Sequence, residues 1–330
     1  MIPANASSAL ADHLWQSTLF AAAAGLLAIA LRNNHARARY WIWWTASLKF
    51  LVPFSLLVAM GSHFGWSTAP ADTSSGLFVA MEQISRPFSA PAVALRTSTA
   101  TVQAAESPIP MVLFAIWACG FAAAVFFWWV RWRRVHAAMR AGSPLALDAE
   151  VPVVSAPGLL EPGIFGVVRP VLLLPDGITD HLAPAHLKAI LAHELCHVRR
   201  RDNLTAAIHM AVEAIFWFHP LIWWLGVRLI EERERACDEE VLRLGNEPGV
   251  YAESILKTCQ YYLESPLVCI SGVTGSDLKK RVVRIMTQRA AHGLDFGRKL
   301  LLGAAGLAAL AGPIVFGLMN APPSRAQSQP

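Results

Sequence analysis

The stretch AILAHELCHVRRRDNL, residues 189–204, contains two histidines four residues apart, with a glutamate directly after the first. Pro184 suits the first turn of a helix, and apolar residues then recur at helical spacing: Leu187, Ile190, Leu191, Leu195 and Val198. On a helix, side chains i and i+4 lie on one face, so His193 and His197 can share a metal ion. Glu194 then projects beside the metal, where it can deprotonate water. The alternative is an amphipathic helix with two solvated histidines.

The composition points to a membrane protein. Of the 330 residues, 55% are hydrophobic and only 15% are charged, which is too apolar for an ordinary soluble domain. The five cysteines form no paired framework, so we interpret them as reduced thiols.

Four segments are long and apolar enough to span a bilayer. Two lie in residues 1–61, and the four cover about 13–31, 40–61, 110–131 and 299–319. Basic residues in 32–40 and directly after the third segment predict that both places are cytoplasmic. Residues 132–298, with the two histidines, then form a cytoplasmic domain, whereas 62–109 and the tail 320–330 are extracytoplasmic. Lys49, inside the second segment, must extend its charge to the interface or pair within the helix bundle.

Candidates for the remaining metal ligands lie further along the chain. Residues 151–175 have the pattern of strands. After the helix that carries His193 and His197, we expect a long helix from about 203 to 230. The acidic helical stretch EERERACDEEVLRLG then follows. Its Glu234 and Asp238 share one helix face. A two-histidine zinc site needs a third protein ligand and a carboxylate that orients an imidazole; Glu234 and Asp238 suit these roles in that order. A solvated charged helix is the alternative.

Together these motifs resemble the M56 family of membrane metallopeptidases, the BlaR/MecR-type antibiotic sensor-transducers. More distantly they resemble the M48 group, whose third ligand lies in an E-x-x-x-D motif, here Glu234 to Asp238. The resemblance covers most of the chain and is carried by the order of apolar segments, AHELCHVRRRDNL, ERERACDEEVL, PGIFGVVRPVLLLP (162–175) and FWFHPLIWW (216–224).

The resemblance implies a membrane α-helical protein with an inserted cytoplasmic α+β, gluzincin-like zinc peptidase domain in the bacterial inner membrane. It implies that His193, His197 and Glu234 bind Zn²⁺, that Glu194 is the general base, and that Asp238 orients a ligand. The reaction is then hydrolysis of a peptide bond in a cytoplasmic regulatory protein, such as a winged-helix repressor, or in the chain itself.

The expected partners include the membrane itself. The lipid bilayer is one; the basic residues sit where topology needs them, so we expect no direct nucleic-acid binding. A homodimer and a separate sensor subunit stay open. Only about eleven residues follow the fourth segment, so we expect no C-terminal penicillin-binding sensor domain. Either the chain is a fragment, or its signal enters through 62–109 or a partner.

Two other functions compete with the signalling peptidase. One is a non-proteolytic signal-transducing scaffold with structural zinc, against which Glu194 argues because a structural site needs no general base. The other is an M48-like housekeeping membrane protease.

Several other residues are interpreted by their surroundings. We expect His219 to be structural rather than a fourth ligand, His209 and Glu213 to form a helix-face pair, and 216–224 to lie at the membrane or in the core. We expect Cys196 and Cys237 to pack a helix interface rather than form a redox switch. Asp202 is expected to pair with the neighbouring arginines.

Two segments are candidate contact surfaces. The hairpin 162–175 is a candidate substrate cradle, and the basic stretch 279–285 is expected along the inner leaflet.

Overall fold

The computed structural model describes residues 4–63, 87–88, 108–157, 161–264, 275–287 and 295–319. The predicted segment 62–109 and tail 320–330 therefore lie almost wholly outside the described residues. The chain divides into two compact units: one comprises Met1–Ile29, Thr45–Trp117 and Gly293–Pro330, and the other comprises Ala30–Trp44 and Ala118–His292. The helix with the two histidines belongs to the second unit.

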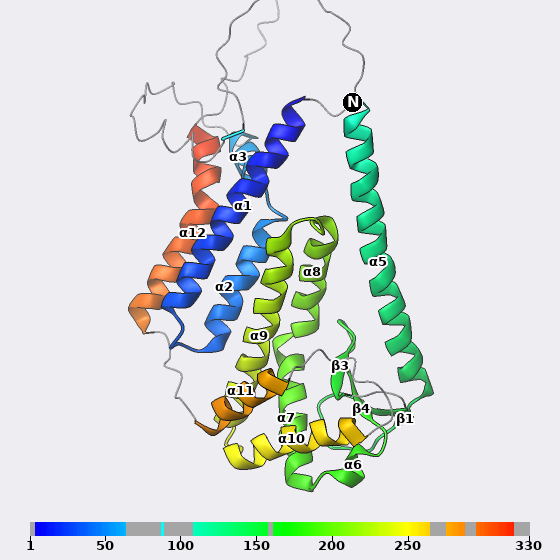
Figure 1. The fold of residues 1–330 in the computed structure, drawn as a ribbon. Helices are drawn as coiled ribbons and strands as arrows, with labels where there is room; N and C mark the ends of the chain where they lie inside the picture. Colours follow the sequence, from blue (N-terminus) through cyan, green and yellow to red (C-terminus); the bar gives the residue numbers. More distant parts are fainter. Residues whose placement is uncertain are drawn as a thin grey trace, which may run out of the picture. The chain divides into compact units, whose positions relative to one another are not determined.

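The first unit is helical. It contains most of α1 (Ala4–Ala30), α3 (Phe54–His63) and α12 (Phe296–Met319) (Figure 1). Helices α3 and α12 pack so closely that a methyl group on Gly61 would overlap the backbone of Ile314. Lys49 is buried, donates to the Ser17 hydroxyl at 3.3 Å and lies over the Phe54 ring. Of the two alternatives for Lys49, pairing within the helix bundle is the one observed.

Apolar helices occupy the predicted membrane segments. Among the described residues, Ser7–Ala30 and α5 (Ile109–Ala141) are long and apolar enough to cross a membrane. The second segment was predicted as one continuous span, but it is broken. Helix α2 (Ala36–Lys49) and α3 meet at 76°, and the pair adds a third candidate only if it forms one bent span. Pro53 lies at the break, where it lacks a backbone N–H and disfavours helical geometry at the residue before it.

The second unit contains a small mixed sheet. It has strands β1 (Ser143–Pro144), β2 (Val153–Ala156), β3 (Gly163–Phe165) and β4 (Val171–Pro175), in the order β1-β2-β4-β3. Strands β2 and β4 are parallel, and the other two pairs are antiparallel. The strands predicted within 151–175 are thus confirmed, and β1 is an addition. The sheet packs on α6 (Ile178–His181) and α7 (Pro184–Arg200) through a core of Val153, Leu172, Leu174, Ile178, Leu182 and Ile190.

The long helix predicted over about 203–230 is wrong. The chain forms α8 (Asp202–Ile215), reverses over 216–219, and continues as α9 (Pro220–Arg243). His219 is extended (φ −98°, ψ 110°), as expected before a proline, and Pro220 occupies the first turn of α9, where its missing N–H costs nothing. The reversal brings the acidic half of α9 back beside α7, since α7 and α9 contact each other.

Four helices share the second core of this unit. Helices α10 (Pro248–Glu264) and α11 (Gly275–Met286) pack with α7 and α9 around Ala189, Val241, Tyr251, Ala252 and Ile285 (Figure 1). Each of these helices contributes a polar side chain to the site described next.

Candidate metal centre

Three candidate ligands predicted from the sequence converge in the structure. The Nε2 atoms of His193 and His197 lie 3.3 Å apart. The Glu234 carboxylate lies 3.3 Å from the first and 3.9 Å from the second. A tetrahedral zinc ion with bonds of about 2.0–2.1 Å separates its ligand atoms by about 3.3–3.4 Å. The donor set therefore fits one tetrahedral ion held by three protein ligands.

Asp202 orients the second imidazole. Helix α7 ends at Arg201, which adopts the left-handed conformation (φ 56°, ψ 41°), and Asp202 starts α8. This turn brings the buried Asp202 carboxylate to 2.8 Å from His197 Nδ1. With a proton on Nδ1, the lone pair of Nε2 faces the other two ligands. Asp202 also accepts a hydrogen bond from Arg200, as predicted; its role toward His197 was missed, because it depends on the helix break.

Asp238 supports the first imidazole through Tyr251. Its carboxylate lies 3.5 Å from His193 Nδ1. The Tyr251 hydroxyl lies between them: it donates to Asp238 at 2.6 Å, and its oxygen is 2.9 Å from His193 Nδ1. Burial, with the Asp238 charge, raises the pKa of Tyr251 well above its usual value, so the hydroxyl keeps its proton. Tyr251 was not identified from the sequence, since no local pattern links it to residues 58 and 13 positions earlier.

A guanidinium group completes the site. Arg281 on α11 donates to Asp238 at 2.7 Å and lies 3.3 Å from His193 Nε2 and 4.0 Å from the Glu234 carboxylate. The stretch 279–285 was predicted to lie along a membrane surface. In the structure, however, Arg281 is turned toward the ligands and Ile285 is buried. The site therefore contains a cation that the sequence did not indicate.

The two glutamates have opposite electrostatic properties. Burial raises the pKa of Glu234, but the hydrogen bond with His193 and the charges of His197 and Arg233 outweigh it and hold the pKa well below its usual value. Glu234 is thus ionised, as a metal ligand must be. Burial raises the pKa of Glu194, and the neighbouring His197 offsets this only in part. A carboxylate with a raised pKa is suited to accept a proton.

The two cysteines beside the site are buried between α7 and α9. Cys237 forms a second potential metal group with His197 and Asp202, and its Sγ atom is 3.4 Å from His197 Nδ1. The hydrogen bond with Cys196 and burial raise the pKa of the Cys237 thiol, which favours its protonated form in the metal-free protein. This geometry agrees with the expected packing role.

Other sequence candidates lie outside the ligand set. His219 precedes α9 and belongs to neither potential metal group among the described residues. The outer edge of β3, the expected substrate cradle, is already engaged, because Asn203 donates to the carbonyl oxygens of Ile164 and Gly166 at 3.0 and 2.9 Å. An incoming strand must therefore displace Asn203. His209 and Glu213 form the predicted helix-face pair at 3.2 Å.

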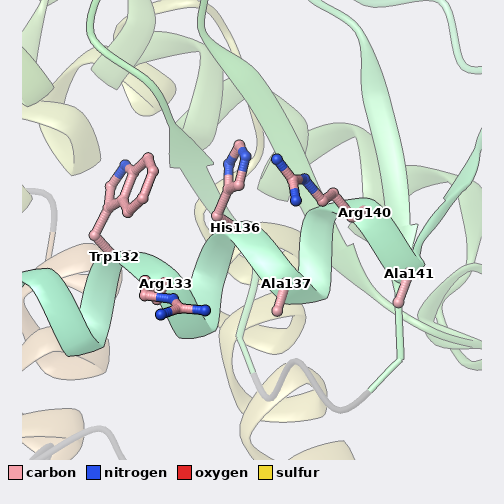
Figure 2. Close-up of a pocket in the computed structure, with 6 residues that line it drawn as sticks. All are labelled: Trp132, Arg133, His136, Ala137, Arg140 and Ala141. Carbon is pink, nitrogen blue, oxygen red and sulfur yellow. The ribbon is translucent and has the colours of Figure 1, made fainter.

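A hollow of about 570 Å³ lies on the last turns of α5, away from these ligands. Figure 2 shows Trp132, His136 and Arg140 projecting from one side of the helix there. The Trp132 and His136 rings are stacked, 4.9 Å apart. None of the ligand residues lines this hollow.

Serine–lysine pairs of the S-x-x-K type, which β-lactam-reactive enzymes use, occur at Ser254–Lys257 and Ser276–Lys279. Ser254 is fully buried, and its hydroxyl donates to the Tyr251 carbonyl at 2.7 Å. Lys257 instead binds Glu253 at 2.8 Å. The first pair is therefore not assembled as a nucleophile and its base.

Membrane-type helices, a small mixed sheet and a His₂Glu set of candidate ligands are features of the class of membrane-associated metallopeptidases. The chain belongs to the family described as BlaR1 peptidase M56, which matches residues 12–285. It is similar to the regulatory protein BlaR1 of Bacillus licheniformis, with 33% identity over 144 residues, which are 42% of this chain and 24% of that protein. It is also similar to the methicillin resistance mecR1 protein of Staphylococcus aureus, with 32% identity over 98 residues, or 29% and 17% of the two chains. The matches thus cover less than a quarter of these relatives.

Proposed function

We propose that this protein is an integral membrane zinc endopeptidase that hydrolyses a peptide bond in a cytoplasmic regulatory protein, or in itself, as a step in signal transduction. The observation that carries this proposal is the convergence of His193, His197 and Glu234, whose ligand atoms lie within 4.8 Å of one another. Membership of a peptidase family supports the activity. The names of the relatives, a regulatory protein and a resistance protein, support the signalling role.

In this proposal each side chain has a defined task. His193, His197 and Glu234 hold the ion, and Asp202, Tyr251 and Asp238 keep the two imidazoles oriented. A zinc ion bound there would supply Lewis-acid polarisation of the scissile carbonyl and of the attacking water. Glu194 takes the proton from that water and passes it to the leaving amine. Arg281, the cation beside the ligands, is placed to hold a carbonyl oxygen of the substrate.

The proposed topology has four membrane spans in a bacterial inner membrane, at about 13–31, 40–61, 110–131 and 299–319, with the gluzincin-like peptidase domain 132–298 facing the cytoplasm. The apolar helices α1, α5 and α12 and the bent pair α2–α3 support it. The peptidase domain would then meet cytoplasmic proteins, and the resemblance to the BlaR/MecR-type transducers makes a winged-helix repressor the proposed substrate.

The test compares zinc content and proteolysis in the full chain, purified in detergent. Wild type, Glu194→Gln and the control Glu240→Gln, whose side chain pairs with Arg243 at the surface, are incubated with a candidate repressor. Mass spectrometry then detects cleavage of the repressor and of the chain. We expect about one zinc ion in all three and cleavage in all but Glu194→Gln. Cleavage by Glu194→Gln would refute the assigned general base, and bound zinc without cleavage in any variant would favour the scaffold.

A further inference from the structure

The hairpin of α8 and α9 has an apolar outer surface that the metal centre does not use. Six of its large hydrophobic side chains are 40–54% exposed: Leu204, Phe218, Trp223, Trp224, Val227 and Ile230. The dense charges of α9 begin directly afterwards, at Glu231. An exposed apolar surface of this kind, rich in tryptophan, is typical of contact with a membrane or a protein.

The polar side chains of the hairpin are turned away from this surface. Buried His209 and partly buried Glu213 of α8 pair with each other at 3.2 Å. They face the α9 backbone, where a Cβ on Gly226 would lie 2.7 Å from the Glu213 carboxylate and 2.8 Å from the His209 ring. Arg228 bonds to Glu231 at 2.9 Å, so its charge points toward the polar end of α9. Membrane segments accommodate charged side chains in these two ways: the side chains pair inside the protein, or they extend toward the membrane interface.

The turn of the hairpin contacts a candidate membrane span. A methyl group on Gly120 of α5 would overlap the Trp217 ring, so the ring lies directly against the helix there. Gly120 is eleven residues before Arg131, the first basic residue of α5. Eleven helical residues span about 16 Å, which is about half of a hydrocarbon core of roughly 30 Å. Trp217 therefore lies near the middle of the apolar part of α5.

A second contact agrees with the placement of the hairpin in the apolar layer. Trp224 packs edge-on against Trp43 of α2, with ring centroids 5.1 Å apart, inside the second apolar segment of the sequence. One turn before Trp43 on α2 and two turns after Trp224 on α9, Arg39 and Glu232 form a buried ion pair at 2.7 Å. Apolar residues of α9 thus face apolar residues of α2, and charged residues face charged residues. The boundary between apolar and polar layers falls near Ile230 and Glu231.

We propose that the α8–α9 hairpin is inserted into the cytoplasmic leaflet of the bilayer, with its turn near the bilayer centre and lipid acyl chains covering its exposed face. The part of α9 from Pro220 to Ile230 has eleven residues and a length of about 16 Å, in agreement with the depth deduced from α5. Glu234 then lies about one helical turn outside the hydrocarbon. If the proposed peptidase function holds, on which this consequence rests, the scissile bond is presented at the membrane surface.

The experiment measures the depth of single nitroxide labels in the full chain, reconstituted into vesicles of phosphatidylcholine and phosphatidylglycerol. Cys119, Cys259 and Cys269 are replaced by serine, and labels are attached to Trp223→Cys, Val227→Cys or Ile230→Cys. Arg243→Cys, on the same helix, is the aqueous control, and Phe127→Cys, exposed on α5, is the membrane control. Electron paramagnetic resonance compares collisions with oxygen, which concentrates in hydrocarbon, and with a water-soluble nickel chelate.

We expect the oxygen-to-nickel collision ratio to be several-fold higher at position 223 than at 243, and to fall in the order 223, 227, 230. In the unmodified chain, a photoactivatable lipid should label peptides from 216–230, which makes the result independent of the substitutions. Oxygen-to-nickel collision ratios as low as that at position 243 at all three hairpin positions would overturn the proposal. Low collision rates with both reagents would also overturn it, because they would mean that protein and not lipid covers this surface. If the Phe127 label also reports water, the proposed membrane topology itself fails.

Discussion

The two histidines of the metal centre are supported in different ways. His197 is held by Asp202, five residues further along the chain, through one direct contact of 2.8 Å. His193 is held by Tyr251, which relays the charge of Asp238 from another helix. One support is local and anionic, whereas the other is long-range and passes through a neutral hydroxyl group.

The two supports depend on different parts of the fold. The local support depends only on the turn between α7 and α8, because both of its residues lie there. The long-range support requires α7, α9, α10 and α11 to be packed together, because its residues come from four helices. A displacement of α10 would therefore reach the metal centre through His193, whereas the support of His197 lies in the turn between α7 and α8. Glu234, the third candidate ligand, lies within 4 Å of both histidines.

The largest expected effect is that of Glu234→Gln, which removes the only anionic ligand of the proposed His₂Glu zinc site. Structural zinc sites gain about 10–16 kcal/mol from four ligands, so the loss of one costs roughly 3 kcal/mol, or a factor of more than about one hundred in affinity. Competition with a chromogenic chelator measures this. Glu240→Gln on the same helix should keep the wild-type affinity, and an equal loss there would show that the effect is not specific to the ligand.

Two substitutions compare the contribution of Asp202, which orients His197, with that of Tyr251, which orients His193. Asp202→Asn should weaken zinc binding by about 10–100-fold, as is usual for a carboxylate that orients a ligand imidazole. Tyr251→Phe should weaken it less, because Asp238 remains 3.5 Å from His193 Nδ1. The same chelator competition gives both values. A larger loss for Tyr251→Phe would mean that the long-range support dominates.

Arg281→Gln should act in the opposite direction. Its guanidinium group lies 3.3 Å from one ligand atom and 4.0 Å from another, so it repels a divalent cation placed between them. Removal should tighten zinc binding by about threefold to tenfold while lowering any peptidase activity. Arg243→Gln, a surface control, should change neither. Weaker zinc binding in Arg281→Gln would show that the arginine is needed to hold His193 and Asp238 in place.

The smallest effect concerns Glu194 in the metal-free protein. Burial raises its pKa in the folded state, so the folded protein binds this proton more tightly than the unfolded chain does. Wild type therefore loses stability as the pH rises through and above about 4.5. Glu194→Gln has no such ionisation, so its Tm in the presence of a chelator should exceed that of wild type at pH 8 but not at pH 4, by about 2–4 °C for each kcal/mol.

Glu253→Gln provides the control for this pH dependence. The hydrogen bond from Lys257 lowers the pKa of Glu253, so its ionisation favours folding, and the glutamine variant should not gain in Tm as the pH rises. An equal gain in both variants would show that the effect does not come from the partly buried carboxyl group of Glu194.

Much of the site could be predicted because its candidate ligands occur as pairs only four residues apart in the sequence. The i,i+4 pair His193 and His197 requires only a helix, which Pro184 and the apolar periodicity indicate. Glu234 and Asp238 have the same spacing on a second helix. The break at 216–219 was missed because the apolar run continues through it, although Pro220 marked the place. Tyr251 and Arg281 could not be found in this way, since ordinary tyrosines and arginines carry no signal of their distant partners.

By itself, the sequence determined the apolar segments, the strands within 151–175, the helix with the two histidines and the identity of the candidate ligands. These depend on periodicity, composition and short spacing, which act within a few turns of chain. Only the tertiary structure decided that α8 and α9 form a hairpin, that Asp202 orients His197, and that Arg281 enters the site. The physical reason is that such contacts arise from packing between separate helices, whose relative positions no single stretch of sequence specifies.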